Sequence, residues 1–179
     1  MSDLHRREER APIDGTPAVT LRPVEPGDEP FLFAVYASTR MDELAQVPWN
    51  EAQREAFLRM QFEAQQSHYR KHYPDASHEI ILLKDEAVGR VYVAREEQLI
   101  TILDITILPE HRSKGLGTPL IKDLQSEAAR AGKPLHIYVE SFNPSLRLFE
   151  RLGFSRIGDD GINILMEWRD LETEGRGRE

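Results

Sequence analysis

The chain has 179 residues, of which 40% are hydrophobic and 30% charged, a composition typical of one folded domain. Its 31 acidic and 23 basic side chains give a formal net charge of −8, which disfavours binding to nucleic acid and to anionic membranes. There is no cysteine, which excludes disulfides, thiolate nucleophiles and cysteine-ligated zinc.

The longest unbroken apolar run is Phe31–Ala37, seven residues, whereas a helix needs about 20 to cross a bilayer. The amino terminus has no apolar core of the kind found in a secretory signal. We therefore expect a cytoplasmic protein, monomeric or homodimeric, with neither nucleic acid nor membrane as a partner.

Both ends of the chain are charged and lack apolar periodicity. We therefore expect a mobile tail at residues 1–16, one domain at residues 17–169, and a second tail at residues 170–179. The first half of the domain predicts a strand, two helices and a three-stranded antiparallel meander. In chain order these elements are Val19–Val24, a helix capped by Asp28 and running to Ser38, a helix opened by the capping box Asn50-x-x-Gln53 and running to His72, and strands at His78–Lys84, Val88–Arg95 and Gln98–Leu108.

The second half of the domain alternates between helices and strands. Thr118 and Pro119 suit the first positions of a helix that Gly132 ends. A strand, a helix and a hairpin then follow, at Leu135–Val139, from Asn143-Pro144 to Gly153, and at Ser155–Gly158 and Ile162–Trp168. The order β-α-α-β-β-β-α-β-α-β-β predicts an α/β protein with a mixed sheet and a strand–loop–helix–strand unit at its centre.

A basic loop between the third meander strand and the next helix predicts an anion site. Gly115 and Gly117 let successive backbone N–H groups turn toward one point, and the start of a helix adds further donors. Residues 111–122 contain three basic and no acidic side chains in an otherwise acidic protein. A pyrophosphate fits this loop best, although an ordinary tight loop with solvated Arg112 and Lys114 is the alternative.

Two common phosphate-binding patterns do not fit this loop. Leu120 stands where the dinucleotide-binding pattern needs its third glycine, and no Gly-Lys-Ser/Thr closes the loop as in a P-loop. The run Arg112-x-x-Gly115-x-Gly117, after a strand that ends at Pro109, instead resembles motif A of the GNAT superfamily of N-acetyltransferases. The run Asn143–Phe154, which contains Leu-Phe-Glu-Arg-Leu-Gly-Phe, resembles motif B of the same superfamily.

The resemblance implies the GNAT fold and transfer of an acetyl group from acetyl-coenzyme A (acetyl-CoA) to a primary amine of a small molecule or peptide. The pantetheine arm would lie between the two central parallel strands, the loop would hold the pyrophosphate, and a backbone N–H near Ile107 would stabilise the oxyanion. The residues implied in acetyl-CoA binding are Ile105, Ile107, Leu108, Arg112, Ser113, Lys114, Gly115, Leu116, Gly117, Thr118, Asn143 and Phe149.

Phe149 departs from the family pattern, because it aligns with the tyrosine that protonates the leaving thiolate. Water, Ser145 or another donor would have to replace it, or the thiolate would leave without assistance. The alternative is a catalytically weak or inactive CoA-binding module that acts as a sensor or interaction protein. A nucleic-acid-binding domain that uses the basic loop is a further alternative, which the net charge of −8 disfavours.

The candidate general bases are Asp104, within the third meander strand, and Glu140, at the end of the next strand. Asp104 ranks slightly ahead because its strand leads directly into the cofactor loop, and a structural hydrogen bond is the alternative for both. His136 is expected in the core or at its rim. No metal site is expected, because His68 and His72 have metal-ligand spacing on a helix but no accompanying carboxylate.

The amine-binding region carries no legible motif. Trp49 and Met60 are candidates for an acceptor pocket, with core packing as the alternative. The acceptor itself therefore stays unidentified at this stage.

Overall fold

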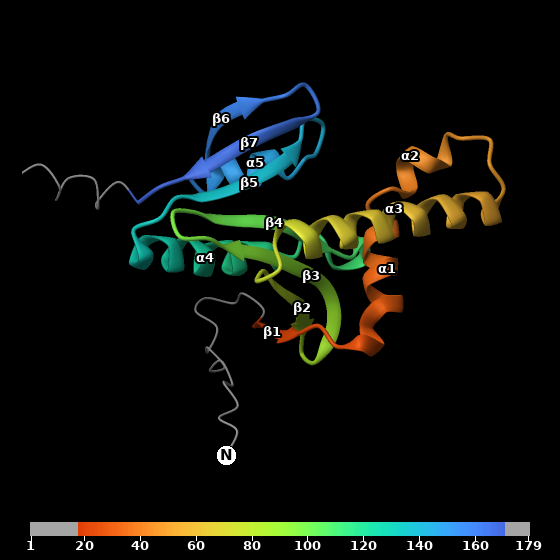
Figure 1. Ribbon diagram of the computed structural model, residues 1–179, viewed down its shortest axis with the longest axis horizontal. Coiled ribbons are helices and arrows are strands. Elements are labelled where there is room, and N and C mark those ends of the chain that lie inside the picture. The colour runs from red at the N-terminus through yellow and green to blue at the C-terminus, as the bar shows by residue number, and fades with distance from the viewer. Residues whose placement is uncertain (1–17, 171–179) are drawn as a thin grey trace, which may run out of the picture.

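A computed structural model describes residues 18–170 of the chain. Within these residues, seven strands form one sheet in the order β1-β2-β3-β4-β5-β7-β6 (Figure 1). Only β4 and β5 are parallel, and every other neighbouring pair is antiparallel. This confirms the predicted mixed sheet with a strand–loop–helix–strand unit at its centre. The strands are β1 (Val19–Pro23), β2 (Ser77–Leu83), β3 (Glu86–Arg95), β4 (Ile100–Ile107), β5 (Leu135–Glu140), β6 (Ser155–Asp159) and β7 (Asn163–Trp168).

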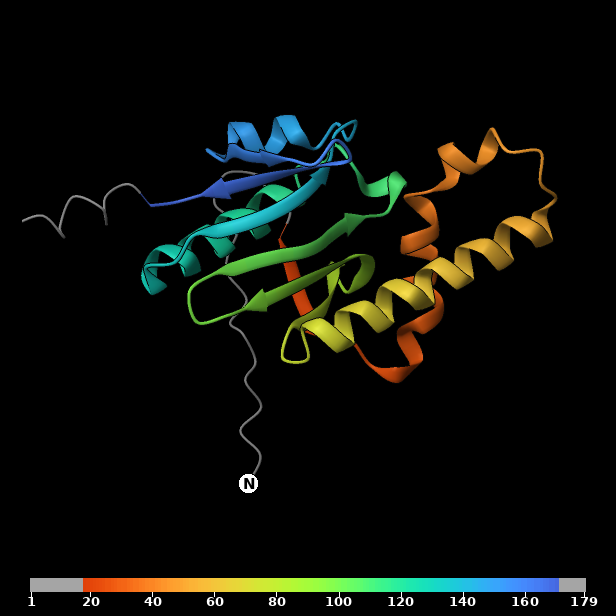
Figure 2. The ribbon, with the colours of Figure 1, turned by 45° about the horizontal axis from the view of Figure 1, so that its top comes forward.

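The helices cover both faces of the sheet. Helices α1 and α3 lie on one face, and α4 and α5 lie on the other (Figures 1 and 2). Helix α2 is short and was not predicted, because Arg40 at its N-cap makes no capping hydrogen bond that the sequence could signal. The helices are α1 (Glu29–Ser38), α2 (Met41–Ala45), α3 (Glu51–His72), α4 (Gly117–Ala131) and α5 (Leu146–Arg151). The predicted tails, except Asp170, lie outside the described residues.

Two helix ends follow directly from local sequence chemistry. At the start of α3 the Asn50 side chain accepts a hydrogen bond from the Gln53 N–H at 2.9 Å, and the Gln53 side chain accepts one from the Asn50 N–H at 3.0 Å. At the end of α4, Gly132 adopts a left-handed conformation with φ of +64°. Both ends confirm the sequence predictions.

Two predicted helix starts were wrong. Helix α4 begins at Gly117, with Leu116 as its N-cap, so Thr118 and Pro119 lie inside the first turn. Proline is tolerated there because first-turn N–H groups have no acceptor within the helix. Helix α5 begins at Leu146 and not at Asn143, whose side chain instead accepts a hydrogen bond from the Ser145 N–H at 2.9 Å in the turn before the helix.

The apolar core has two parts, one on each face of the sheet. The larger part packs α4 and α5 against the sheet and includes Ile102, Ile121 and Phe149. The smaller part joins α1, α2 and α3 to β2 and includes Phe62 and Ile80. The sheet is therefore held on both faces, which fixes the positions of the carboxyl ends of its central strands.

The central strands β4 and β5 separate part-way along their length. They pair only at Ile100–Leu135, Thr101–His136 and Ile102–Ile137, although both strands continue beyond these pairs. Just past the last pair, the register between β3 and β4 shifts so that Leu103 is an extra residue in β4, which strengthens the local twist. Figure 2 shows the two strands diverging toward their carboxyl ends, as the resemblance implied.

Candidate active site

The loop from β4 to α4 presents backbone donors to solvent. Its first turn is a short 3-10 helix, Pro109–His111, and both Ser113 and Gly115 have positive φ values, +59° and +75°. Leu116 is buried and anchors the loop, whereas residues 112–115 are exposed. Within residues 18–170, the backbone N–H groups of residues 113–117 donate no hydrogen bond. An anion can therefore be bound by these groups and by the uncapped start of α4.

The Arg112 side chain holds the loop in place by hydrogen bonds. Its Nε donates to the Ile107 carbonyl at 2.8 Å, and its Nη2 lies 3.5 Å from the Ser38 hydroxyl at the end of α1. The guanidinium thus joins the loop to β4 and to the opposite layer of helices, while Lys114 is an exposed cation. The alternative that Arg112 is only a solvated surface charge is therefore wrong, because its guanidinium makes contacts within the protein.

The two glycines of the loop differ in what they require. At Gly115 the left-handed backbone conformation favours glycine. Space does not, because a Cβ there would meet no atom within 4 Å. Gly117 has an ordinary helical conformation, and its Cβ would meet only Ile107 and Leu148 side chains at 3.9 and 4.0 Å. The protein itself has room for a methyl group at Gly117, so packing does not account for the glycine.

The separation of the strands leaves one edge of β4 without a partner strand from Leu103 to Ile107. Such an edge offers backbone N–H and C=O groups to an extended ligand. The side chains of Ile105 and Ile107 pack against the larger core. Both backbone groups of Leu108 are occupied, since its N–H donates to Val88 and its carbonyl accepts from His111, each at 2.9 Å.

Close backbone packing holds the other edge of β4. A Cβ at Gly89 on β3 would lie 2.2 Å from the Thr106 carbonyl oxygen, so only glycine allows this approach. The end of β4 is therefore fixed on the β3 side and free on the β5 side.

Asp104 lies just beyond the bulge and faces α3. Its Oδ2 is 2.5 Å from Nη2 of Arg90 on β3, and its Oδ1 accepts a hydrogen bond from the Thr106 hydroxyl at 2.7 Å. Gln65 of α3 also accepts from Arg90 Nη2, at 2.8 Å. Arg90 is only 2% exposed, and its Nε and Nη1 have no hydrogen-bond partner among the described residues.

Arg90 was missed in the sequence, although a signal was present. It stands in the apolar run Val88–Val93, and a charged side chain in a buried strand needs a partner of opposite charge. The strand that follows in the chain, β4, contains one carboxylate, Asp104, so the two could have been paired.

Tyr69 of α3 holds the bulge of β4 in place. Its hydroxyl donates to the Leu103 carbonyl at 3.1 Å, and its ring stacks on Tyr92 with centroids 4.9 Å apart. Burial, with a smaller effect of Asp104, raises the pKa of Tyr69, which keeps the hydroxyl a donor. The edge of the His78 ring meets the same Tyr92, and burial lowers the pKa of His78 to about 4.

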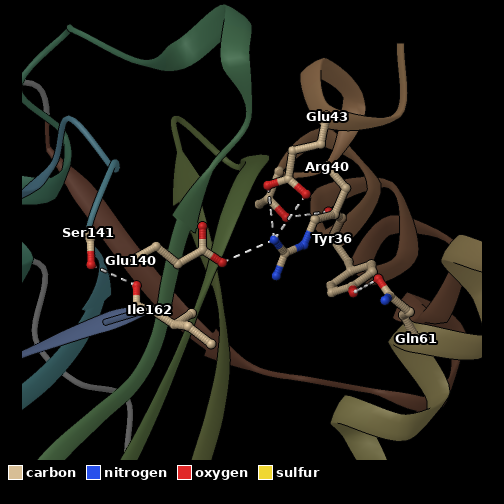
Figure 3. A network of polar contacts seen from close by, with 8 residues as sticks. Tyr36, Arg40, Glu43, Gln61, Glu140, Ser141 and Ile162 are labelled. Carbon is tan, nitrogen blue, oxygen red and sulfur yellow. Dashed lines mark hydrogen bonds and ion pairs between the residues drawn. The ribbon is translucent and has the colours of Figure 1, made fainter. Parts of the chain in front are cut away.

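Glu140 ends β5 and contacts the layer of helices α1 and α2. Figure 3 shows Arg40, in the turn between these helices, reaching to Glu140 and to Glu43. Its Nη1 lies 3.0 Å from Glu140 and 3.1 Å from Glu43. Beside Arg40, the Tyr36 hydroxyl donates to Gln61 of α3 at 3.1 Å. Both candidate bases, Asp104 and Glu140, are therefore paired with an arginine.

The two predicted site residues of the second motif differ in exposure. Asn143 is exposed, and its side chain is used in the turn before α5. Phe149 is 2% exposed and packs edge-to-face against Phe154, with centroids 5.3 Å apart. Phe149 therefore belongs to the larger core.

The histidines singled out in the sequence lie in different settings. His68 and His72 are exposed on α3 with ring centroids 4.4 Å apart. His136 is partly buried, and its Nε2 lies 2.6 Å from a carboxylate oxygen of Glu167 on β7. Across residues 18–170 no group of three or more histidines and carboxylates is placed to hold a metal ion. In the same residues, no helix is both long and apolar enough to cross a membrane.

Comparison with known proteins identifies the family. Residues 39–154, more than half of the chain, match the family model described as the acetyltransferase (GNAT) family. The chain belongs to this family. The match spans both the basic loop and the run that ends at Phe154, so it confirms the resemblance seen in the sequence. No curated protein matches the chain.

Solved structures share the GNAT fold of this chain. The PaiA N-acetyltransferase of Thermoplasma acidophilum, in complex with coenzyme A, has a TM-score of 0.65 and 16% identity over 86% of this chain and 99% of its own. An acetyltransferase of Thermus thermophilus has a TM-score of 0.62 and 20% identity over 85% and 97%. A GNAT acetyltransferase of Elizabethkingia anophelis with acetyl-CoA bound has a TM-score of 0.55 and 16% identity over 85% and 98%.

Proposed function

We propose that this GNAT protein transfers the acetyl group of acetyl-CoA to a primary amine. The observation that carries the proposal is the loop of residues 112–118, whose backbone N–H groups from 113 to 117 have no acceptor in the described part of the chain. It follows directly on the unpaired edge of β4. The Thermoplasma and Elizabethkingia structures, which hold coenzyme A and acetyl-CoA, support the same donor here.

The residues present fit this donor. The loop N–H groups, the start of α4 and Lys114 suit a pyrophosphate, and the room at Gly117 suits its close approach. The free edge of β4 beyond Leu103 suits the amide groups of the pantetheine arm. Together with Thr118, Asn143 and Phe149, these residues stay the proposed donor site.

The chemistry then follows from the position of the thioester between β4 and β5. The neutral amine attacks the thioester carbonyl carbon, a C–N bond forms, and the C–S bond breaks. The attacking nitrogen loses a proton to a base, and the leaving thiolate takes up a proton from a donor or from water. A backbone N–H near Ile107 stabilises the oxyanion.

Asp104 and Glu140 are the proposed proton acceptors, either directly or through water. Each carboxylate is on the face of the sheet that carries α1 and α3, and each is held in place by an arginine. Asp104 is the more restrained, because both of its oxygens have partners.

A CoA-binding module with little or no activity is the second candidate function. The buried phenylalanine at position 149 favours it, since no hydroxyl stands where the family has one. The two candidates differ in turnover and not in binding.

An assay of free thiol tests the proposal. The purified protein is incubated with acetyl-CoA and a panel of primary amines, and free coenzyme A and the acetylated amine are measured. Amine-dependent release of thiol is the expected result. Tight binding of acetyl-CoA without turnover of any amine would instead support the inactive module. The cytoplasmic location and the monomeric or homodimeric state remain predictions.

A further inference from the structure

A pocket beside the proposed reaction site has the features of an amine-binding site. Its volume is about 380 Å³, and it lies between α2, the segment that follows it, and α3. It is lined by Arg40, Glu43, Leu44, Val47, Trp49, Phe57 and Gln61. The wall thus combines four apolar side chains with three polar ones.

The apolar side of the pocket is built around two aromatic rings. Trp49 and Phe57 pack edge-to-face with centroids 5.1 Å apart, and both are only partly buried. They therefore leave ring surface for a ligand to cover. Of the two residues suggested in the sequence for an acceptor pocket, Trp49 lines this pocket, whereas Met60 is 58% exposed and does not.

On the polar side of the pocket, Arg40 and Glu43 carry opposite charges, and Glu140, which contacts Arg40 but does not line the pocket, adds a negative charge beside it. Arg40 is paired with two carboxylates, Glu43 at 3.1 Å and Glu140 at 3.0 Å. The side chains of these glutamates are 61% and 46% exposed, so their oxygens can accept further hydrogen bonds. A cationic ammonium group complements this charge, whereas a second carboxylate would be repelled.

Arg40 also connects the pocket to the reaction site. It lines the pocket, and its guanidinium contacts Glu140 at the carboxyl end of β5 (Figure 3). A ligand with its apolar arm against the exposed ring surface of Trp49 and Phe57 can therefore place its amino group near Glu140. That position is at the end of the strand beside which the thioester is proposed to lie.

We infer that the acceptor is a primary amine joined by a short linker to an aromatic or branched apolar group, without a carboxylate. This inference rests on the proposed function and specifies its substrate class. The apolar group fills the pocket, and the acidic pair Glu43 and Glu140 attracts the ammonium group. Removal of the apolar arm then weakens binding, because its burial is the main favourable contribution.

Four probe amines test the inference. 2-Phenylethylamine carries both features, ethylamine lacks the ring, phenylalanine adds a carboxylate, and 1,4-diaminobutane replaces the ring by a second charge. We expect kcat/KM for 2-phenylethylamine to exceed that of each other probe by about tenfold or more. Equal values for ethylamine, or a preference for phenylalanine or 1,4-diaminobutane, would overturn the inference and leave acetyl transfer intact.

Variants of the pocket provide the matched comparison. Phe57→Ala should raise KM for 2-phenylethylamine about tenfold and leave KM for ethylamine unchanged. Met60→Ala, on the same helix but outside the pocket, should change neither. If Phe57→Ala folds poorly, Val47→Phe fills the pocket from the opposite segment and should produce the same selective loss. An equal effect on KM for both amines would contradict the assignment of this pocket as the binding site for the apolar group of the amine.

Binding separates this inference from the proposed function. Calorimetry of 2-phenylethylamine with the CoA-saturated protein needs no turnover. Suppose that no amine is acetylated, but 2-phenylethylamine binds and Phe57→Ala weakens its binding. The assignment of the pocket is then supported, and the proposed acetyl transfer is contradicted. If amines are acetylated but 2-phenylethylamine binds no better than ethylamine, the pocket assignment fails alone.

Discussion

Arg90 on β3 and Asp104 on β4 form an ion pair, with 2.5 Å between Nη2 and Oδ2, in which the arginine is almost completely buried. A buried guanidinium is tolerated only when a carboxylate and hydrogen bonds compensate for its lost hydration. Gln65 supplies one such hydrogen bond, but two guanidinium nitrogens have no partner among the described residues. Asp104 therefore has a structural role, whatever its role in catalysis.

The structural and catalytic roles of Asp104 can be separated by two variants. Asp104→Asn should lower kcat/KM by about tenfold or more, chiefly on the acidic side of the pH profile, with little change in CoA affinity. The same change leaves Arg90 buried without its counter-ion, which should lower the free energy of unfolding by about 3 kcal/mol. Urea unfolding and pH–rate profiles measure the two effects.

The double variant Arg90→Met/Asp104→Asn is the control. Because it removes the buried charge together with its partner, it should regain most of the stability and none of the activity. A stable Asp104→Asn protein with an unaltered pH–rate profile would remove Asp104 from the mechanism and leave Glu140 or a bound water as the base.

His78 should make the stability of the fold depend on pH. Burial, aided by the charge of Arg90, lowers its pKa from 6.5 to about 4, so the unfolded chain takes up a proton at a higher pH than the folded one does. The stabilisation is therefore fully present above pH 6.5 and is lost as the pH falls toward 4. His78→Phe keeps the ring against Tyr92 and should flatten this dependence.

The urea midpoint measured between pH 7.5 and 4.5 checks the effect of His78. Protonation of Asp28 does not contribute to the change in stability over this pH range. Hydrogen bonds from Arg22 lower the pKa of Asp28 from 3.8 to about 2, so Asp28 titrates only in stronger acid. An equal loss of stability in wild type and His78→Phe across this range would contradict the assignment.

Phe149 should accept a tyrosine if the site retains the space that a hydroxyl needs. Phe149→Tyr should fold and should hold or raise kcat, because it restores a proton donor where the family has one. Phe154→Tyr, at the other ring of the same packed pair, is the control and should lower stability without raising kcat. A drop in kcat of about tenfold with intact CoA binding would show that another group serves as the acid and that the hydroxyl obstructs it.

Local chemistry made much of the fold predictable. The reciprocal cap of Asn50 and Gln53, the left-handed Gly132 and the positive φ of Gly115 each depend on a few adjacent residues. For that reason the sheet order at the centre, the long helix and the glycine turn of the basic loop could be inferred before the structure. The start of α4 was misplaced by two residues because proline fits anywhere in a first turn.

The contacts that build the candidate site are between distant segments, and no local pattern encodes them. Arg40 meets Glu140, and Tyr69 meets the Leu103 carbonyl, only because α1 and α3 pack on the sheet. The pocket formed by Trp49 and Phe57 depends in the same way on α2, which had no capping signal. Sequence reasoning named Asp104 and Glu140 but not their arginine partners, of which only Arg90, in its buried strand, had a signal in the sequence.

The central claim is that the loop of residues 112–118 binds the pyrophosphate of acetyl-CoA, and Gly117 provides the sharpest variant. A Cβ there makes only ordinary contacts with the Ile107 and Leu148 side chains, so Gly117→Glu should fold while it places bulk and a negative charge at the start of α4. Ser126→Glu adds the same charge at an exposed position of α4 far from the loop and is the matched control.

Calorimetric titration of coenzyme A into these three proteins is the most direct test. We predict that the wild type and Ser126→Glu bind coenzyme A with equal affinity, and that Gly117→Glu, with an unchanged thermal unfolding midpoint, shows no binding. Unchanged affinity in a folded Gly117→Glu protein would contradict the account.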